Sequence, residues 1–273
     1  MTIGGISTSA SVQSSLTALA NTAQLLQTAQ RNLSTGKSVN SPSDNATAFY
    51  ASQSLLQQAS DLSNLKDDFA TSLTTVNATT NSISSVSQVV QQLQGIVSQA
   101  SSTTDTTTRA NLASQYNALL PQLDQLVNDA TFNGTNLLNS TSNSLVVNLN
   151  ANNTSTLTIP GVDITSSGLN IAPATNGFAT AADINSANSQ LLNAQTTLNA
   201  SAASFGGNAT LLQINQDFTS NQINSLQTAS DNLTGADINQ EAANLLALQA
   251  QNQLGIISLS ISAQQAQSVL KLF

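Results

Sequence analysis

The chain has 273 residues and a formal net charge of −8, and only 7% of its residues are charged, against about 25% in ordinary soluble proteins. An acidic chain with five bases cannot neutralise many phosphates, so the composition argues against nucleic-acid binding. His and Cys are both absent, which removes disulfides, the common zinc ligands, a thiol nucleophile and the most versatile general base. We therefore expect no catalysis, no cofactor and no metal ion.

Apolar residues make up 40% of the chain, but aromatic residues only 3%, and there is no Trp. A core built from Ala, Leu, Ile and Val favours thin helix bundles over thick sheet layers. No stretch approaches the roughly 18 uninterrupted apolar residues of a membrane span, so we expect no membrane insertion. The segment Met1–Gly5 lacks the basic region and apolar run of a cleavable signal peptide.

The first predicted element is a helix over residues 11–34. Apolar residues in it recur at steps of four and three, which places them on one helix face that must be buried against another helix. They are Val12, Leu16, Leu19, Ala23, Leu26 and Leu33. Gly36 is expected to end this helix. The segment Ser41–Asp44 then predicts a turn and a helix start, with Ser43 or Asp44 as the cap.

The next segment is the most regular. Its heptad pattern predicts one helix of roughly 50 residues, about 75 Å long at about 1.5 Å per residue. The seam residues are Leu55, Leu62, Leu65, Phe69, Val76, Ile83, Val86, Val90, Leu93 and Val97. A polar loop over 101–108 leads to another helix, which Pro121 is expected to kink or split. Asn133-Gly134 then predicts a tight turn.

From Asn143 the period changes to two. Alternation over 145–149 and 156–160, with Asn152-Asn153 between, predicts a β-hairpin within a β region over about 143–177. Helical spacing returns at Ile184 and continues to Leu233, weakened locally at Gly206-Gly207.

Gly235 predicts a hinge before a terminal helix with its own apolar seam. That seam contains Ala242, Leu245, Ile256, Leu259, Ala263, Ala266 and Leu270. Two apolar helices at opposite ends of the chain predict that the termini pair and then assemble with other copies. The predicted fold is mainly α: an elongated antiparallel bundle with paired terminal helices and a small β-hairpin. The terminal domain is 1–40 plus 235–273, the inner domain is 41–234, and no large outer domain is expected.

The few charged residues near the terminal helices are candidates for polar contacts between subunits. Arg31 and Lys37 are two of five bases, and Asp44, Asp237 and Glu241 are possible acidic partners. Solvated surface pairs contribute at most about 1 kcal/mol each. In so charge-poor a chain we favour pairing. Asp237 and Glu241 lie one helical turn apart, and a cap plus a surface charge explains them better than a metal or acid–base pair.

Three segments resemble bacterial flagellins. Arg31 to Ala46 resembles the family's N-terminal signature, Ala130 to Leu138 resembles the turn after its inner helix, and Gln267 to Phe273 resembles its C-terminus. They follow one another in the family's order and are spread over nearly the whole length of the chain. The short polar middle resembles flagellins with little or no outer domain, such as those of several alphaproteobacteria.

The resemblance implies a subunit that polymerises into the extracellular flagellar filament for swimming motility. It also implies export through the flagellar type III apparatus, an export chaperone on the C-terminal helix, and contacts with cap and hook-associated proteins. The assembly residues are then Val12, Leu16, Leu19, Leu26, Leu33, Leu245, Ile256, Leu259 and Leu270. Where many flagellins carry charges that a vertebrate toll-like receptor recognises, this chain has Gln92, Gln94 and Gly95, so a reporter-cell assay is expected to show weak activation.

Three alternatives remain open. A hook–filament junction protein shares the N-terminal signature and paired terminal helices, and differs in not forming long filaments by itself. A secreted enzyme on a flagellin-like scaffold needs a site that the short β region, without His or Cys, does not offer. An intracellular coiled-coil scaffold is excluded if the protein is found in sheared extracellular filaments.

Overall fold

The computed structural model describes the backbone of residues 10–270 and the side-chain surroundings of residues 12–265. Within these limits the chain is mainly helical with one two-stranded antiparallel sheet, which confirms the predicted fold class. The elements are α1 (Ala10–Thr35), α2 (Ala46–Ser102), α3 (Thr106–Asp129), β1 (Ser144–Asn148), β2 (Thr156–Pro160), the short 3-10 helix η1 (Thr175–Phe178), α4 (Ala181–Thr234) and α5 (Ile238–Leu270).

The structure contains two compact units. The terminal unit is Met1–Gln58 with Asn224–Phe273, and the central unit is Ala59–Ile223. Helices α2 and α4 contribute residues to both units. The predicted domain limits, after residues 40 and 234, were placed at the loops that follow α1 and α4. They stay a prediction.

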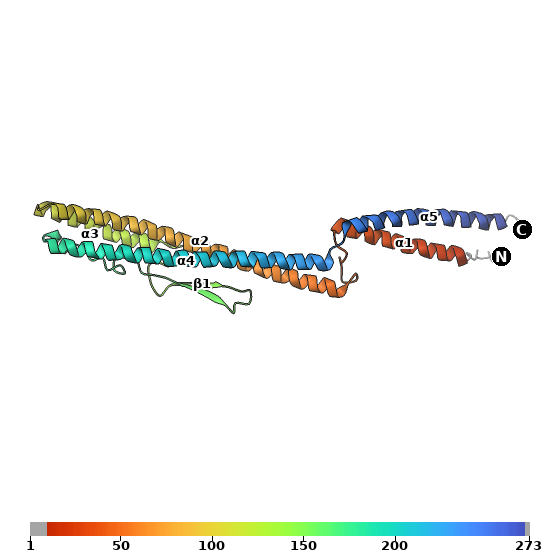
Figure 1. Ribbon diagram of the computed structural model, residues 1–273, viewed down its shortest axis with the longest axis horizontal. Helices are drawn as coiled ribbons and strands as arrows, with labels where there is room; N and C mark the ends of the chain where they lie inside the picture. The colour runs from red at the N-terminus through yellow and green to blue at the C-terminus, as the bar shows by residue number, and fades with distance from the viewer. Residues whose placement is uncertain (1–9, 271–273) are drawn as a thin grey trace, which may run out of the picture. The chain divides into compact units, whose positions relative to one another are not determined.

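In the terminal unit, α1 and α5 pack along each other, as predicted for the terminal helices (Figure 1). The covered residues of both helices recur at steps of three and four, the spacing of a helix-pair seam. On α1 they are Val12, Ser15, Leu19, Thr22, Leu26, Ala29 and Leu33. On α5 they are Leu245, Leu248, Asn252, Gly255 and Leu259. Pairing therefore uses a seam that mixes small residues with Leu.

Part of the predicted seam lies elsewhere on these helices. Leu16 is 48% exposed and Ile256 is 53% exposed, so neither is covered by the partner helix. The reason is close approach: a Cβ on Gly255 would lie only 2.8 Å from Cδ1 of Leu19. The distance between packed helices follows the size of the side chains at the contact, and here small residues between the Leu side chains bring the two helices together.

The central unit is built on one hydrophobic core that α2, α3, α4 and the hairpin share. Most of the predicted seam of α2 is buried in it: Leu65, Phe69, Val76, Ile83, Val86, Val90, Leu93 and Val97. The side chain of Ser87 bonds that of Gln195, and Gln94 donates to the carbonyl of Leu191 at 3.4 Å. From the first of these contacts to the second, the residue number increases on α2 and decreases on α4. The two helices therefore run antiparallel (Figure 1).

Neither Pro121 nor Gly206-Gly207 divides its helix in this unit. Of the predicted kink or split at Pro121, the split is wrong, because helix α3 is continuous through this residue. Proline removes one hydrogen bond, to the carbonyl of Asn117, but burial of residues on either side of Pro121, such as Tyr116 and Leu123, holds the helix together. Helix α4 likewise continues across Gly206-Gly207, where Phe205 and Leu212 are buried on both sides.

The β region follows the prediction closely. Strands β1 and β2 pair antiparallel, with Leu145 opposite Ile159 and Val147 opposite Leu157. Val147 and Ile159 are buried, whereas Val146 points away from the core. Alternating side chains thus attach one face of the hairpin to the central core.

The segment before α4 contains a short left-handed turn. Asn176, Gly177 and Phe178 have consecutive φ values of 47°, 63° and 57°. Phe178 is fully buried, and its ring stacks edge-on against Tyr116 with centroids 5.5 Å apart. Burial raises the pKa of Tyr116 to about 12, and in the described part of the chain its hydroxyl has no hydrogen-bond partner. Packing thus holds an aromatic residue in a backbone region it ordinarily avoids.

Arg109 ties this segment to the end of α2. Its Nε donates to the carbonyls of Ala100 and Thr103 at 3.1 and 2.8 Å, and its Nη1 donates to the carbonyl of Ala179 at 3.1 Å. A cation at a helix C-terminus also interacts favourably with the helix dipole. One side chain therefore fixes three loop or helix-end carbonyls.

Candidate functional site

The turn after α1 carries most of the polar contacts of the terminal unit. Gly36, at φ 70°, donates its N–H to the carbonyl of Asn32 and ends α1, as predicted. The N–H groups of Ser38 and Val39 both donate to the carbonyl of Thr234, the last residue of α4. The end of α1 and the end of α4 are therefore joined through backbone hydrogen bonds.

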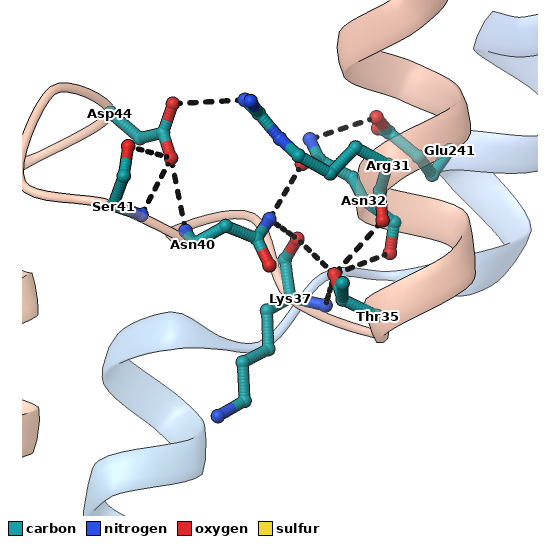
Figure 2. A network of polar contacts seen from close by, with 8 residues as sticks. All are labelled: Arg31, Asn32, Thr35, Lys37, Asn40, Ser41, Asp44 and Glu241. Atoms are coloured by element: carbon teal, nitrogen blue, oxygen red, sulfur yellow. Dashed lines mark hydrogen bonds and ion pairs between the residues drawn. The ribbon is translucent and has the colours of Figure 1, made fainter.

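Asp44 organises this turn but does not cap α2. Its carboxylate accepts from the N–H of Asn40, and from both the N–H and the hydroxyl of Ser41, at 2.9–3.0 Å. Arg31 Nη2 lies 3.1 Å from the same carboxylate (Figure 2). The cap of α2 is Asn45, which accepts from the N–H of Ala48. The predicted caps Ser43 and Asp44 are therefore wrong, because Asp44 is already occupied by the preceding turn.

A second group of contacts links α1, the turn and α5. Asn32 is 8% exposed, and its Nδ2 donates to Oε1 of Glu241 at 3.1 Å. Asn40 donates in turn to Oδ1 of Asn32 and to the carbonyl of Lys37, at 3.1 and 2.9 Å (Figure 2). The only Glu of the sequence thus fixes α5 against α1. We call the residues Asn32, Asn40 and Glu241 the polar clasp.

The remaining predicted polar candidates have distinct places. Asp237 caps α5, accepting from the N–H groups of Asn239 and Gln240, as the cap interpretation predicted. Arg31 pairs with Asp44 of the same chain. Lys37 makes no ion pair among the described residues; it lines a pocket of about 420 Å³ with Asn40 and other residues of the terminal unit.

We expect Asp44→Asn to weaken the terminal unit near neutral pH and to flatten its response to acid. The hydroxyl of Ser41, then the N–H of Asn40, hold the pKa of Asp44 below its usual 3.8. A lowered folded-state pKa gives stability that is present above the unfolded value and is lost as the pH falls through the folded pKa. Chemical denaturation at neutral and acidic pH measures both effects.

Asp129→Asn is the matched control, because it removes the same charge from an exposed carboxyl outside this turn. Equal acid sensitivity of the wild type and Asp44→Asn would contradict the role given to Asp44.

The predicted apolar candidates divide into three groups. Val12, Leu19, Leu26, Leu33, Leu245 and Leu259 are half-buried in the seam between α1 and α5 of one chain. Leu16 and Ile256 face outward. The side chain of Leu270 lies outside the described residues.

Helix α5 is apolar on a second face that the sequence prediction missed. Its residues follow at steps of four and three, and each is exposed: Leu246, Ala250, Leu254, Ile257 and Ile261. We call them the outer stripe. Because residues two positions apart on a helix are about 200° apart, Gly255 faces α1 while Ile257, 54% exposed, points to the other side. The signal was present in the sequence, since the 254–261 segment is apolar on more than one side.

Between Ile238 and Leu270 the only charged residue is Glu241, and it belongs to the polar clasp. No helix in the described part of the chain is long and apolar enough to cross a membrane. Among the same residues, no group of three or more acids could hold a metal ion. Large exposed apolar surfaces of this kind are typical of protein contact sites.

Paired terminal helices with an uncovered apolar stripe, joined to a bundle of long helices, define a self-assembling helical subunit. Residues 6–143 match the bacterial flagellin N-terminal helical region, and residues 181–273 match the bacterial flagellin C-terminal helical region. The chain belongs to the bacterial flagellin family.

Relatives of full length support this assignment. Flagellin FljM of Caulobacter vibrioides is 27% identical over 274 residues, which cover 100% of both chains. A flagellin of Brucella melitensis is 26% identical, with 99% of both chains covered. A solved structure of a putative flagellar hook-associated protein from Vibrio parahaemolyticus shares the fold, with a TM-score of 0.60, 15% identity, and coverage of 70% of this chain and 100% of that one.

The chain is therefore a structural subunit of the flagellar filament, an extracellular polymer. The alternative of a hook–filament junction protein is not favoured, because the family matches and the full-length relatives are flagellins. The hook-associated structure, at its low identity, shows a common fold alone.

Proposed function

We propose that subunits join through the outer stripe of α5 together with Leu16 and Ile256, while the seam between α1 and α5 closes within each chain. The observation that best supports this proposal is that α5 is apolar on two sides and that α1 covers only one of them. Large exposed apolar patches on a soluble protein mark contact sites. In a polymer of identical chains, another copy is the natural occupant.

The energetics favour this assignment. Burying an exposed Leu or Ile side chain contributes about 1.5–3 kcal/mol. The outer stripe offers four such residues, and it carries no charge whose desolvation would oppose contact. The seam within one chain, built from small residues and Leu, leaves this apolar surface for neighbours.

Among the predicted polar contacts between subunits, Lys37 is the strongest candidate. Arg31, Asp237 and Glu241 already have partners within the chain. Lys37 lines an open pocket and has no ion pair among the described residues. An acidic side chain of a neighbouring subunit would give Lys37 an ion-pair partner, although an exposed pair contributes little, at most about 1 kcal/mol.

The outer stripe also supports the expected partners other than identical copies. A hydrophobic stripe that stays uncovered until assembly needs protection beforehand, which supports binding of the C-terminal helix by an export chaperone. Cap and hook-associated proteins would meet the same stripe at the ends of the polymer. We keep export through the flagellar type III apparatus and a lack of catalytic activity as parts of this proposal. In it, 1–40 plus 235–273 form the filament's inner tube and 41–234 the surrounding bundle.

Cysteine accessibility tests the contact directly, because the sequence has no Cys. A single Ile257→Cys chain should react quickly with a maleimide as a monomer and at least several-fold more slowly after polymerisation. Asn152→Cys, on the exposed loop between β1 and β2, is the control and should react alike in both states. Equal labelling of Cys at position 257 in monomers and filaments would refute the proposal.

A further inference from the structure

The sequence contains two Asn-Gly steps, Asn133-Gly134 and Asn176-Gly177. In such a step the backbone nitrogen of Gly can attack the side-chain carboxamide of the preceding Asn, since Gly has no Cβ to obstruct the approach. The structure surrounds the two steps differently.

Asn133 lies in an open surface turn. Its neighbours Phe132 and Thr135 exchange two backbone hydrogen bonds of 2.9 Å, and these close the turn. In the described part of the chain, the Asn133 carboxamide has no hydrogen bond, and a Cβ on Gly134 would meet no atom within 4 Å. Opening a small exposed turn of this kind costs little compared with global unfolding.

Asn176 is held more firmly. Thr180, and to a smaller extent the side chain of Asn176, lower the pKa of Asp183, so Asn176 lies beside this acid at the start of α4. Gly177 packs against Ala110, whose atoms lie 3.7 Å from where a Cβ would stand. Phe178 follows immediately and is buried. Movement of this backbone is therefore opposed by core packing.

We propose that Asn133 is a site of spontaneous deamidation in the folded protein and that Asn176 is protected. The nitrogen of Gly134 bonds to Cγ of Asn133, the bond from Cγ to Nδ2 breaks, and ammonia leaves with the proton of the Gly134 amide. Water then opens the five-membered imide at either carbonyl, giving aspartate or isoaspartate. No oxidant or reductant takes part, and water is the only co-reactant.

The product adds a negative charge beside an existing one. Asn133 and Asp68 line the same pocket of about 270 Å³, between α2 and the start of the hairpin. A carboxylate at position 133 therefore repels Asp68.

Peptide mass spectrometry of the full chain, aged in mildly alkaline buffer, tests this inference. Cleavage before Asp residues yields peptides 129–162 and 163–182, which separate the two Asn-Gly steps. Aspartate at position 133 creates a new cut after residue 132, whereas isoaspartate leaves peptide 129–162 whole with the mass gain of one amide converted to acid. We expect modification at Asn133 several-fold faster than at Asn176 in the folded protein, and similar rates in guanidinium.

The Asn133→Gln variant should lose the early product of peptide 129–162, while peptide 163–182 is unchanged. Tandem fragmentation separates Asn133 from Asn139 and Asn143, whose side chains bond each other. Equal rates at Asn133 and Asn176 in the folded chain, or earlier change at Asn139 or Asn143, would overturn the assignment. This test does not depend on which surface polymerises.

Discussion

Ile257→Asp is expected to abolish seeded filament growth while the monomer keeps its helix content. Ile257 is exposed on the outer stripe, so a charge there is solvated in the monomer. In the proposed contact the same carboxylate would be buried without a partner, which costs several kcal/mol. The milder Ile257→Ala should raise the critical concentration roughly 10–100-fold, since each 1.4 kcal/mol corresponds to about tenfold. Sedimentation and electron microscopy of seeded reactions measure both variants, and circular dichroism checks the monomer.

Asn244→Asp is the matched control, because Asn244 is exposed on α5 but lies outside the outer stripe. It adds the same charge to the same helix and should still allow growth. If both variants stop growth equally, the general lack of charge on α5 matters and the stripe has no special role. If Ile257→Asp grows normally, α5 does not join subunits by this face.

Phe178→Ala is expected to lower the free energy of unfolding of the central unit by about 3–5 kcal/mol, as for other large-to-small changes in a core. Phe178 fills the core against Tyr116 and holds a left-handed backbone at φ 57°. Alanine removes the packing and leaves the unfavourable backbone conformation, so the segment before α4 should also become sensitive to limited proteolysis. Denaturant titration, with protease digestion, gives both readouts.

Phe218→Ala provides the same chemical change at a surface position, because Phe218 is 63% exposed on α4. Surface substitutions ordinarily change stability by less than about 0.5 kcal/mol. A similar loss in both variants would show that the packing of Phe178 is not what stabilises this segment.

The sequence predicted the features that depend on local pattern. Residues such as Leu65 and Val90 repeat with the helix period and are buried as expected. Asn133-Gly134 forms the expected tight turn, with φ of 48° and 77°, and strict alternation identified both strands. In each case the physical cause acts over a few neighbouring residues, so a single sequence carries it.

Features that depend on distant residues were missed. Asn32 and Glu241 are 209 positions apart, and no local pattern pairs them. Arg109 binds two carbonyls at the end of α2 and the carbonyl of Ala179, which lies 70 positions further along the chain. The seam of α1 was partly misplaced, because only apolar side chains were assigned to it, whereas the polar residues Ser15 and Thr22 are covered and Leu16 and Ala23 are exposed.

The uncharged character of the outer stripe has a thermal consequence. Apolar burial is driven by entropy near room temperature and decreases the heat capacity of the system, so its contribution fades on cooling. Contacts between subunits made by Leu246, Leu254 and Ile257 have no ion pairs to compensate for this loss. They should therefore weaken on cooling and strengthen with modest warming.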